Sequence, residues 1–195
     1  SGATTGNRPD SRARVALLVP SSNTVMENDL HAALPKDRVT VHTARMYLTV
    51  TTPEAEERMI DQEAPKAADD LGTVNPDVLV FGCTSGGSLH GLDYDAKVCG
   101  DLGRRAGCPA IGVISSVLAA LGRRKLSTVA VITPYIDSLT EAVAGSVRES
   151  GIEVVAAHGM GIDVNVALAD PTPDEIAEFA KQRLSGLTFD GLFVS

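Results

Sequence analysis

Residues 14–30, RVALLVPSSNTVMENDL, join an apolar, β-branched run to a helical pattern through the turn PSSNT. Such a run is typical of a buried strand, and Ser, Asn and Thr in the turn are residues that cap helices. Residues 128–143, TVAVITPYIDSLTEAV, repeat the same pattern 114 positions later. The repeated strand–turn–helix unit predicts a chain built from two similar halves.

The repeat continues along both copies. Residues 39–46, VTVHTARM, resemble residues 153–160, EVVAAHGM, and residues 77–82, DVLVFG, resemble residues 190–195, DGLFVS. Short apolar runs also match by composition alone, but three matches in the same order favour a duplication. Strictly alternating strands and helices predict an α/β fold with two pseudo-symmetric halves, each a parallel sheet flanked by helices. Ligands bind at the carboxyl ends of such strands, so we expect a cleft between the halves.

The domain boundaries follow from the repeat. We expect residues 1–13 to be a disordered lead or an expression remnant, residues 14–127 the first half and residues 128–195 the second. The expected strands are 14–20, 39–45, 77–82, 110–114, 128–133, 153–157 and 191–194. The expected helices are 24–33, 53–71, 94–106, a short one ending at 121, 136–150 and 173–187. Residues 83–91, CTSGGSLHG, are expected to form a loop.

The second copy stops one residue short of the first. Residues 77–82 run directly into Cys83, whereas the matching residues 190–195 stop at Ser195. We therefore expect a longer protein in which a second cysteine directly follows Ser195, and in which a helix covers the last strand. The alternatives are a break at a modified or unplaced residue and a true end at Ser195.

Composition limits the classes of partner. The 195 residues contain 17 Lys and Arg against 25 Asp and Glu, a net charge of −8. This balance argues against a nucleic-acid or anionic-membrane surface, which needs clustered positive charge. No apolar run approaches the roughly 20 residues of a membrane span. The first residues lack the apolar core of a signal peptide, and three cysteines lack the spacing of a disulfide framework. We expect a cytoplasmic protein.

Cys83 is the candidate nucleophile. It follows a buried strand and opens a loop rich in Gly, Ser and Thr, whose backbone N–H groups can lower the pKa of a thiol and bind an anion. The alternative is a structural thiol, because free cysteines are among the most buried residues. We expect Cys99 and Cys108 to be structural. His90 is a candidate base for Cys83, although a surface histidine is the commoner case.

Polar residues at other strand ends are candidate ligand contacts. Ser22 and Asn23 lie in PSSNT, where a helix begins and a carboxylate or phosphate can bind; simple helix capping is the alternative. Tyr135 occupies the matching turn of the second half, and Asn165 follows the next strand. The four His are scattered and no CxxC pair is present, so we expect no metal site. Nucleotide-binding glycine motifs and a GxSxG elbow are also missing from the sequence.

PSSNTVME, GCTSG, TPY and Asn165, in this order, resemble the maleate cis-trans isomerases of the aspartate/glutamate racemase superfamily, which also contains arylmalonate decarboxylase. The resemblance covers about residues 14–195. It implies two α/β halves, an active site between them, one cysteine from each half, no cofactor, and a homodimer or larger homo-oligomer. It also implies that Asn23, Tyr135 and Asn165 contact substrate carboxylates, with the loop after Cys83 supplying backbone donors. Ser22, Thr84 and Ser85 are the further candidate substrate-binding residues.

Within the superfamily, Cys83 separates this chain from the decarboxylases, which lack the first cysteine. Racemases usually carry Cys-Asn-Thr where this chain has Cys83-Thr84-Ser85. The expected activity is therefore isomerisation of maleate to fumarate by thiolate addition, bond rotation and elimination. The alternatives are a two-cysteine racemase or decarboxylase acting on a small carboxylic acid, and a non-catalytic module that binds a small anion.

Overall fold

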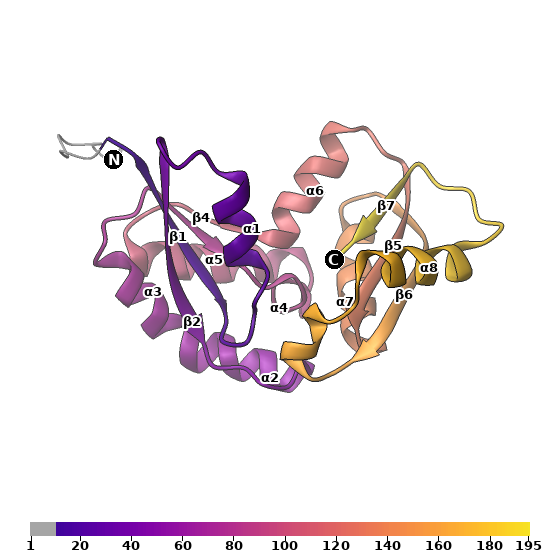
Figure 1. Ribbon diagram of the computed structural model, residues 1–195, viewed down its shortest axis with the longest axis horizontal. Helices are drawn as coiled ribbons and strands as arrows, with labels where there is room; N and C mark the ends of the chain where they lie inside the picture. The colour runs from indigo at the N-terminus through magenta and orange to yellow at the C-terminus, as the bar shows by residue number, and fades with distance from the viewer. Residues whose placement is uncertain (1–10) are drawn as a thin grey trace.

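The structure, a computed structural model, describes residues 11–195. It contains two parallel sheets, one in each half of the chain (Figure 1). The first has the order β2-β1-β3-β4 and the second the order β6-β5-β7. The strands are β1 (Ala13–Pro20), β2 (Val39–Met46), β3 (Val78–Phe81), β4 (Ala110–Gly112), β5 (Thr128–Tyr135), β6 (Glu153–Ile162) and β7 (Gly191–Val194). The equivalent order of β2-β1-β3 and β6-β5-β7 confirms the predicted α/β fold of two similar halves.

The start of the chain falls partly outside this description. The predicted disordered lead covers residues 1–13, of which residues 1–10 lie outside the described residues. β1 begins at Ala13, one residue before the predicted strand. The first half therefore enters its sheet almost where the sequence pattern placed it.

The repeat is visible in individual hydrogen bonds. Asp77 Oδ2 accepts a hydrogen bond from the backbone N–H of Arg14 at 2.8 Å, next to the position where the pairing of β1 with β3 begins. Asp190 Oδ2 accepts from the N–H of Thr128 at 3.0 Å, before β7 and β5 pair. These aspartates hold the starts of equivalent strands together, which explains why an Asp precedes both apolar runs.

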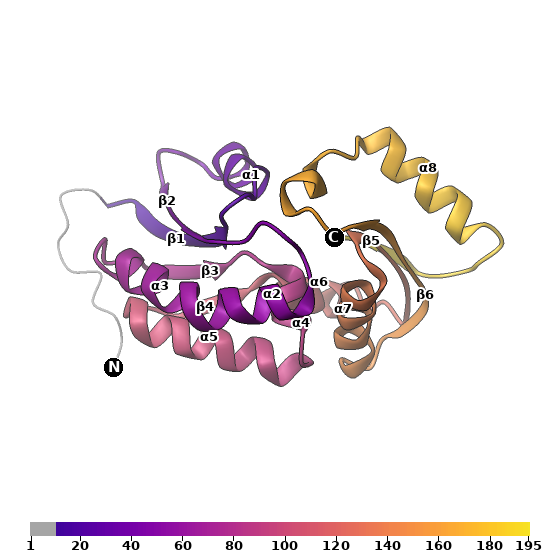
Figure 2. The same ribbon diagram turned by 90° about the horizontal axis from the view of Figure 1, so that it is seen from below.

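The helices cover both sheets. They are α1 (Met26–Ala33), α2 (Pro53–Arg58), the π-helix η1 (Met59–Glu63), α3 (Ala64–Gly72), α4 (Thr84–Ser88), α5 (Leu92–Ala106), α6 (Val113–Arg123), α7 (Asp137–Glu149), the 3-10 helix η2 (Asn165–Ala169) and α8 (Pro173–Leu184). The helix expected over residues 53–71 thus contains a π-helical turn. Figure 1 shows α4 and α6 between the two sheets, and Figure 2 shows the end of β7 at the junction of the halves.

The expected loop after β3 is wrong, because Thr84–Ser88 form the helix α4. The glycines that suggested a loop are required by close packing instead. A Cβ at Gly86 would lie 2.9 Å from Cys83 Sγ, and a Cβ at Gly87 would lie 2.6 Å from Asp95 Oδ1. The sequence shows the glycines but not these contacts, which depend on the tertiary structure.

α2 begins at Pro53 for local reasons. Thr52 Oγ1 accepts from the N–H of Ala55 at 3.3 Å, and Pro occupies the first turn, where its missing N–H costs nothing. Glu56 follows one turn later and is the buried residue of this helix. The cap therefore fixes where that carboxyl enters the protein.

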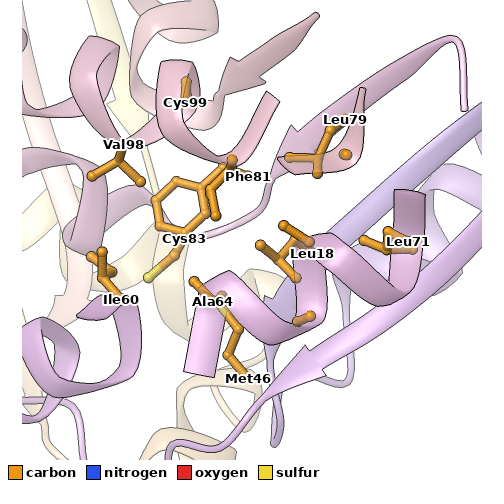
Figure 3. Close-up of a cluster of buried hydrophobic side chains, with 14 of the residues drawn as sticks. Leu18, Met46, Ile60, Ala64, Leu71, Leu79, Phe81, Cys83, Val98 and Cys99 are labelled. Carbon is orange, nitrogen blue, oxygen red and sulfur yellow. The ribbon is translucent and has the colours of Figure 1, made fainter. Parts of the chain in front are cut away.

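Each half has its own apolar core. In the first, side chains from β1 and β3 pack against α3 and α5, and Figure 3 shows Cys83 within this cluster, between Ile60 and Phe81. In the second, β5 packs against α7, and Ile114 from α6 joins this core. Packing in the first core therefore fixes the position of Cys83.

The halves are joined by segments that match in the repeat. Val50 and Val164 form an antiparallel bridge. Beside it, Thr51 N donates to the carbonyl of Asp163 at 2.6 Å. Contacts between residues 114 positions apart place a pseudo-twofold axis at this bridge. Within residues 11–195 no helix is both long and apolar enough to cross a membrane.

Two glycines test the packing of the second half. A Cβ at Gly159 in β6 would overlap the carbonyl oxygen of Tyr135 and the hydroxyl of Thr140, whereas a Cβ at Gly145 in α7 would meet nothing within 4 Å. We expect Gly159→Ala to lower the free energy of unfolding by about 2 kcal/mol or more. Gly145→Ala should raise it by roughly 0.5–1 kcal/mol through helix propensity. Urea denaturation measures both, and equal effects would contradict the packing of β6 on β5.

Candidate active site

A cavity of about 390 Å³ lies between the halves, at the carboxyl ends of β1, β3 and β5. Its wall includes the candidate nucleophile and all the predicted substrate contacts: Ser22, Asn23, Cys83, Thr84, Ser85, Tyr135 and Asn165. Ser195, the last residue of the sequence, also lines it. A larger groove of about 500 Å³ runs along η1 and α5 and contains none of these residues.

Cys83 is the N-cap residue of α4, and its side chain is 6% exposed. Its Sγ packs against Gly86 and lies 3.9 Å from Glu56 Oε1, which can accept the thiol proton in a hydrogen bond. Burial, and then the charge of the Glu56 carboxylate, raise the pKa of the thiol far above its usual value. The backbone N–H of Gly86 does lower this pKa, as the sequence analysis expected of the loop, but it does not offset desolvation, so the net shift is upward.

Glu56 is the residue that sequence reasoning missed. It is 1% exposed, and its Oε1 accepts a hydrogen bond from Ser85 Oγ at 2.5 Å. Its Oε2 is buried and has no hydrogen-bond partner among the described residues. Burial raises the pKa of Glu56 from 4.5 to about 7. The signal for it was available, since Glu56 precedes Met59 and Ile60 by three and four residues and thus shares their apolar face.

Asn165 is held by groups from the first half. Its Nδ2 donates to Ser22 Oγ at 2.8 Å, and its Oδ1 accepts from Thr51 Oγ1 at 3.2 Å. Thr51 and Asn165 are equivalent in the repeat, so these side chains meet on the pseudo-twofold axis. Ser22 Oγ in turn donates to the carbonyl of Leu48 at 2.8 Å. This buried polar chain fixes the floor of the cavity across both halves.

Asn23 caps α1, and helix capping is the alternative to ligand binding that the sequence analysis gave for this turn. Its Oδ1 accepts from the N–H groups of Val25 and Met26 at 3.0 and 2.9 Å. The amide Nδ2 is the group that remains to contact a ligand. Asn23 can therefore both begin a helix and line the cavity.

Tyr135 reaches the cavity from the end of β5. The side chain is 8% exposed, and its hydroxyl hydrogen-bonds with Ser195 Oγ at 3.0 Å. Burial raises the pKa of Tyr135 to about 12, so the phenol stays neutral and can donate a hydrogen bond. Thr84 also hydrogen-bonds with this side chain.

The other candidates lie elsewhere. His90 Nε2 pairs with Glu57 Oε1 at 2.7 Å on the surface and is not part of the cavity wall. Cys99 belongs to the first apolar core, and Cys108 packs against that core. In the part of the chain that the structure describes, no three His, Cys, Asp or Glu side chains are grouped to hold a metal ion.

The cavity wall carries no cationic side chain among residues 11–195. Its ionisable acids are Asp29 and Glu56, and its other polar groups are hydroxyls, amides and backbone N–H groups. A bound anion would therefore be recognised by neutral donors. Such donors are fixed in place here by helix starts and by the polar chain through Asn165.

Comparisons with known proteins agree on one family. The family described as arylmalonate decarboxylase matches residues 15–195. Maleate isomerase from Geobacillus stearothermophilus is 28% identical over 183 residues, which span 86% of this chain and 71% of that protein. Maleate isomerase from Pseudomonas putida is 29% identical over 192 residues, 93% of this chain and 75% of that protein. The predicted resemblance is confirmed.

A solved structure supports the fold independently. Maleate isomerase from Pseudomonas putida S16, determined as a cysteine-to-alanine variant with maleate, superposes with a TM-score of 0.84 at 27% identity. The match covers 92% of this chain and 76% of that one. This chain therefore shares the fold of that maleate isomerase over most of its length.

Glu56 predicts a pH-dependent stability difference. Since its pKa rises from 4.5 to about 7 on folding, the stability that comes from the neutral carboxyl is complete below about pH 4.5 and is lost as the pH rises through about 7. Glu56→Gln cannot ionise, so its stability relative to wild type should increase by about 3 kcal/mol between about pH 4.5 and pH 8. Thermal unfolding across this range measures it. The exposed Glu57→Gln is the control, and a flat difference for Glu56→Gln would refute the burial of the charge.

Proposed function

Because the chain belongs to the arylmalonate decarboxylase family, we propose that it is a maleate cis-trans isomerase that forms fumarate with Cys83 as the nucleophile. The observation that carries this proposal is a thiol in a cavity between the halves whose other polar wall groups are mostly neutral hydrogen-bond donors. The curated relatives with the name maleate isomerase support the choice of substrate. Cys83 favours an isomerase over a decarboxylase, since the decarboxylases lack the first cysteine.

The cavity offers maleate two kinds of donor. Thr84 and Ser85 at the start of α4 line it from the first half and Tyr135 lines it from the second, and Asn23 supplies an amide. We place maleate so that one carboxylate lies near each half of the protein and the alkene lies between the carboxylates, at Cys83 Sγ. Asn165 and Ser22 hold each other and shape the floor on which the substrate rests.

The reaction starts from the thiolate of Cys83. Cys83 Sγ forms a bond to one alkene carbon, and the π electrons move into the carboxylate on the other carbon. The former double bond is now single, so the two ends rotate relative to each other. The electrons return, the C–S bond breaks and fumarate leaves. Donors aimed at the charged carboxylate stabilise the intermediate more than the substrate, which lowers the barrier.

The second cysteine that the resemblance implies has a natural place in this scheme. Ser195 N donates to the carbonyl of Ile132 at 2.9 Å, as Gly82 N does to the carbonyl of Leu18 at 2.7 Å. Ser195 is thus the counterpart of Gly82, which precedes Cys83. A cysteine following Ser195 would face Cys83 across the substrate and complete the pair.

The resemblance also leads us to propose a cytoplasmic homodimer or larger homo-oligomer. All three cysteines are free thiols in the structure, which fits a reducing compartment. Size-exclusion chromatography with light scattering tests the oligomeric state.

Cys83→Ala should abolish isomerisation. Incubating the full-length protein with maleate and following proton NMR should show fumarate from wild type and a loss of roughly a thousand-fold or more in the variant. Cys108→Ala, which removes a thiol outside the cavity, should keep the wild-type rate. With a small α-amino acid in D₂O in place of maleate, exchange of the α-proton, together with no fumarate from maleate, would instead support a racemase. Ligand-dependent melting without turnover, unchanged in Cys83→Ala, would support a binding module.

Tyr135→Phe should separate the hydroxyl from the packing of the ring. We expect kcat/KM for maleate to fall about 100-fold, because one donor to the charged intermediate is removed. The melting temperature should change little, since the ring stays in the second core. Tyr47→Phe, at a side chain that is 67% exposed, is the control. An unchanged kcat/KM in Tyr135→Phe would remove Tyr135 from the site.

A further inference from the structure

Glu56 is a buried carboxyl that the reaction above leaves without a role. Glu56 belongs to the helix α2, whereas the other groups follow the ends of strands, yet its side chain lines the same cavity. One oxygen is held by Ser85, and the other has no hydrogen-bond partner among the described residues. An unpaired buried carboxyl is costly, so its presence beside the nucleophile calls for a chemical reason.

The thiol of Cys83 needs help to react. Burial disfavours its charged form, and no Lys, Arg or His of residues 11–195 lines the cavity to offset this. The backbone N–H of Gly86 and the hydroxyl of Ser85, 4.0 Å from Sγ, both lower the pKa of the thiol, and Gly86 can approach because a Cβ there would lie only 2.9 Å from Sγ. These groups favour a thiolate but remove no proton. The acceptor nearest the thiol is Glu56 Oε1, 3.9 Å away.

We propose that Glu56 is the general base that takes the proton of Cys83 as the thiol attacks, and that Ser85 is the positioning residue that holds Oε1 toward the sulfur. The proposal rests on the proposed function only in taking Cys83 as the nucleophile. It adds an acid–base group from α2 to a site otherwise built from strand ends.

The step balances with the groups present. The S–H bond breaks, its proton forms an O–H bond on the Glu56 carboxylate, and the sulfur electron pair forms the C–S bond. On elimination the C–S pair returns to sulfur, and Glu56 gives the proton back. No oxidant, reductant or co-reactant is needed.

The electrostatics of the site suit a base. A pKa of about 7 lets a large share of Glu56 be ionised near neutral pH while keeping it basic enough to accept a proton. The ionisable side chains that face Glu56 are Cys83, Tyr135 and Asp29. The charge of Glu56 raises the pKa of both Cys83 and Tyr135, and Asp29 lies on the part of the wall that α1 supplies. On the adjoining η1, Asp61 is exposed, and α4 has no ionisable side chain.

A purely electrostatic role for Glu56 predicts a change in the reactivity of Cys83 that is opposite to the change predicted for a general base. The Glu56 carboxylate raises the pKa of the thiol by repulsion. If repulsion were its only effect, neutralising Glu56 would make Cys83 more reactive. If Glu56 is the base, neutralising it makes Cys83 less reactive. The sign of the change therefore decides between the two.

The test is alkylation of Cys83 by iodoacetamide in the full-length protein, with Cys83 resolved from Cys99 and Cys108 by peptide mass spectrometry. In wild type the rate constant should rise through about pH 7 and then level off, following ionisation of Glu56. Glu56→Gln should lack this step and react about 100-fold more slowly at about pH 8. Glu57→Gln, one residue away and paired with His90 outside the cavity, should match wild type.

Two further variants test the assignment. Glu56→Asp keeps a carboxylate and should restore part of the pH step. Ser85→Ala removes a hydrogen bond that lowers the pKa of Glu56, so the step should move to higher pH. A faster or unchanged Glu56→Gln, with its fold verified by circular dichroism, would overturn the proposal. Because alkylation needs no maleate, a protein that shows this pattern but forms no fumarate would refute the isomerase function and not the base.

Discussion

The contact on which the site depends is the antiparallel bridge of Val50 and Val164 between the two halves. Each sheet alone presents polar turns at the carboxyl ends of its strands, as parallel sheets do. The bridge, with Thr51 and Asn165 hydrogen-bonded beside it, brings the two sets of ends to one cavity. Cys83 then shares a wall with Tyr135 from the other half. Without this junction, neither half would enclose a ligand.

The sequence predicted the topology because its repeat marks equivalent strands directly. Cys83, Tyr135 and Asn165 follow strands, and strand ends meet at one edge, so their convergence on the cavity could be predicted before any contact was known. Glu56 could not be predicted in the same way. Its spacing to Met59 and Ile60 places it on their apolar face, but an acidic residue in the first turn of a helix is also favourable for the helix dipole alone, and the packing of α2 decides that this one is buried.

The two errors of interpretation have the same physical origin. Gly86 and Gly87 suggested a loop, but they are small because Cys83 Sγ and Asp95 pack against them. The predicted lowering of the Cys83 pKa considered backbone donors and omitted burial, which dominates here. Both depend on how closely distant parts of the chain approach. Local sequence carries the types of residue at a site but not the solvent that their neighbours exclude.

Burial of the thiol also explains why the site would need a base rather than a cation. A cationic side chain beside Cys83 would favour the thiolate, but it would also bind the substrate carboxylates and keep them from neutral donors aimed at the intermediate. A buried carboxyl avoids that competition. The cost of a buried carboxylate is that it repels a dicarboxylate substrate, and this repulsion is smallest while Glu56 holds the thiol proton. Proton transfer from Cys83 to Glu56 would therefore coincide with the moment at which the negative charge moves onto the substrate, so that the charge in the cavity changes least during the step.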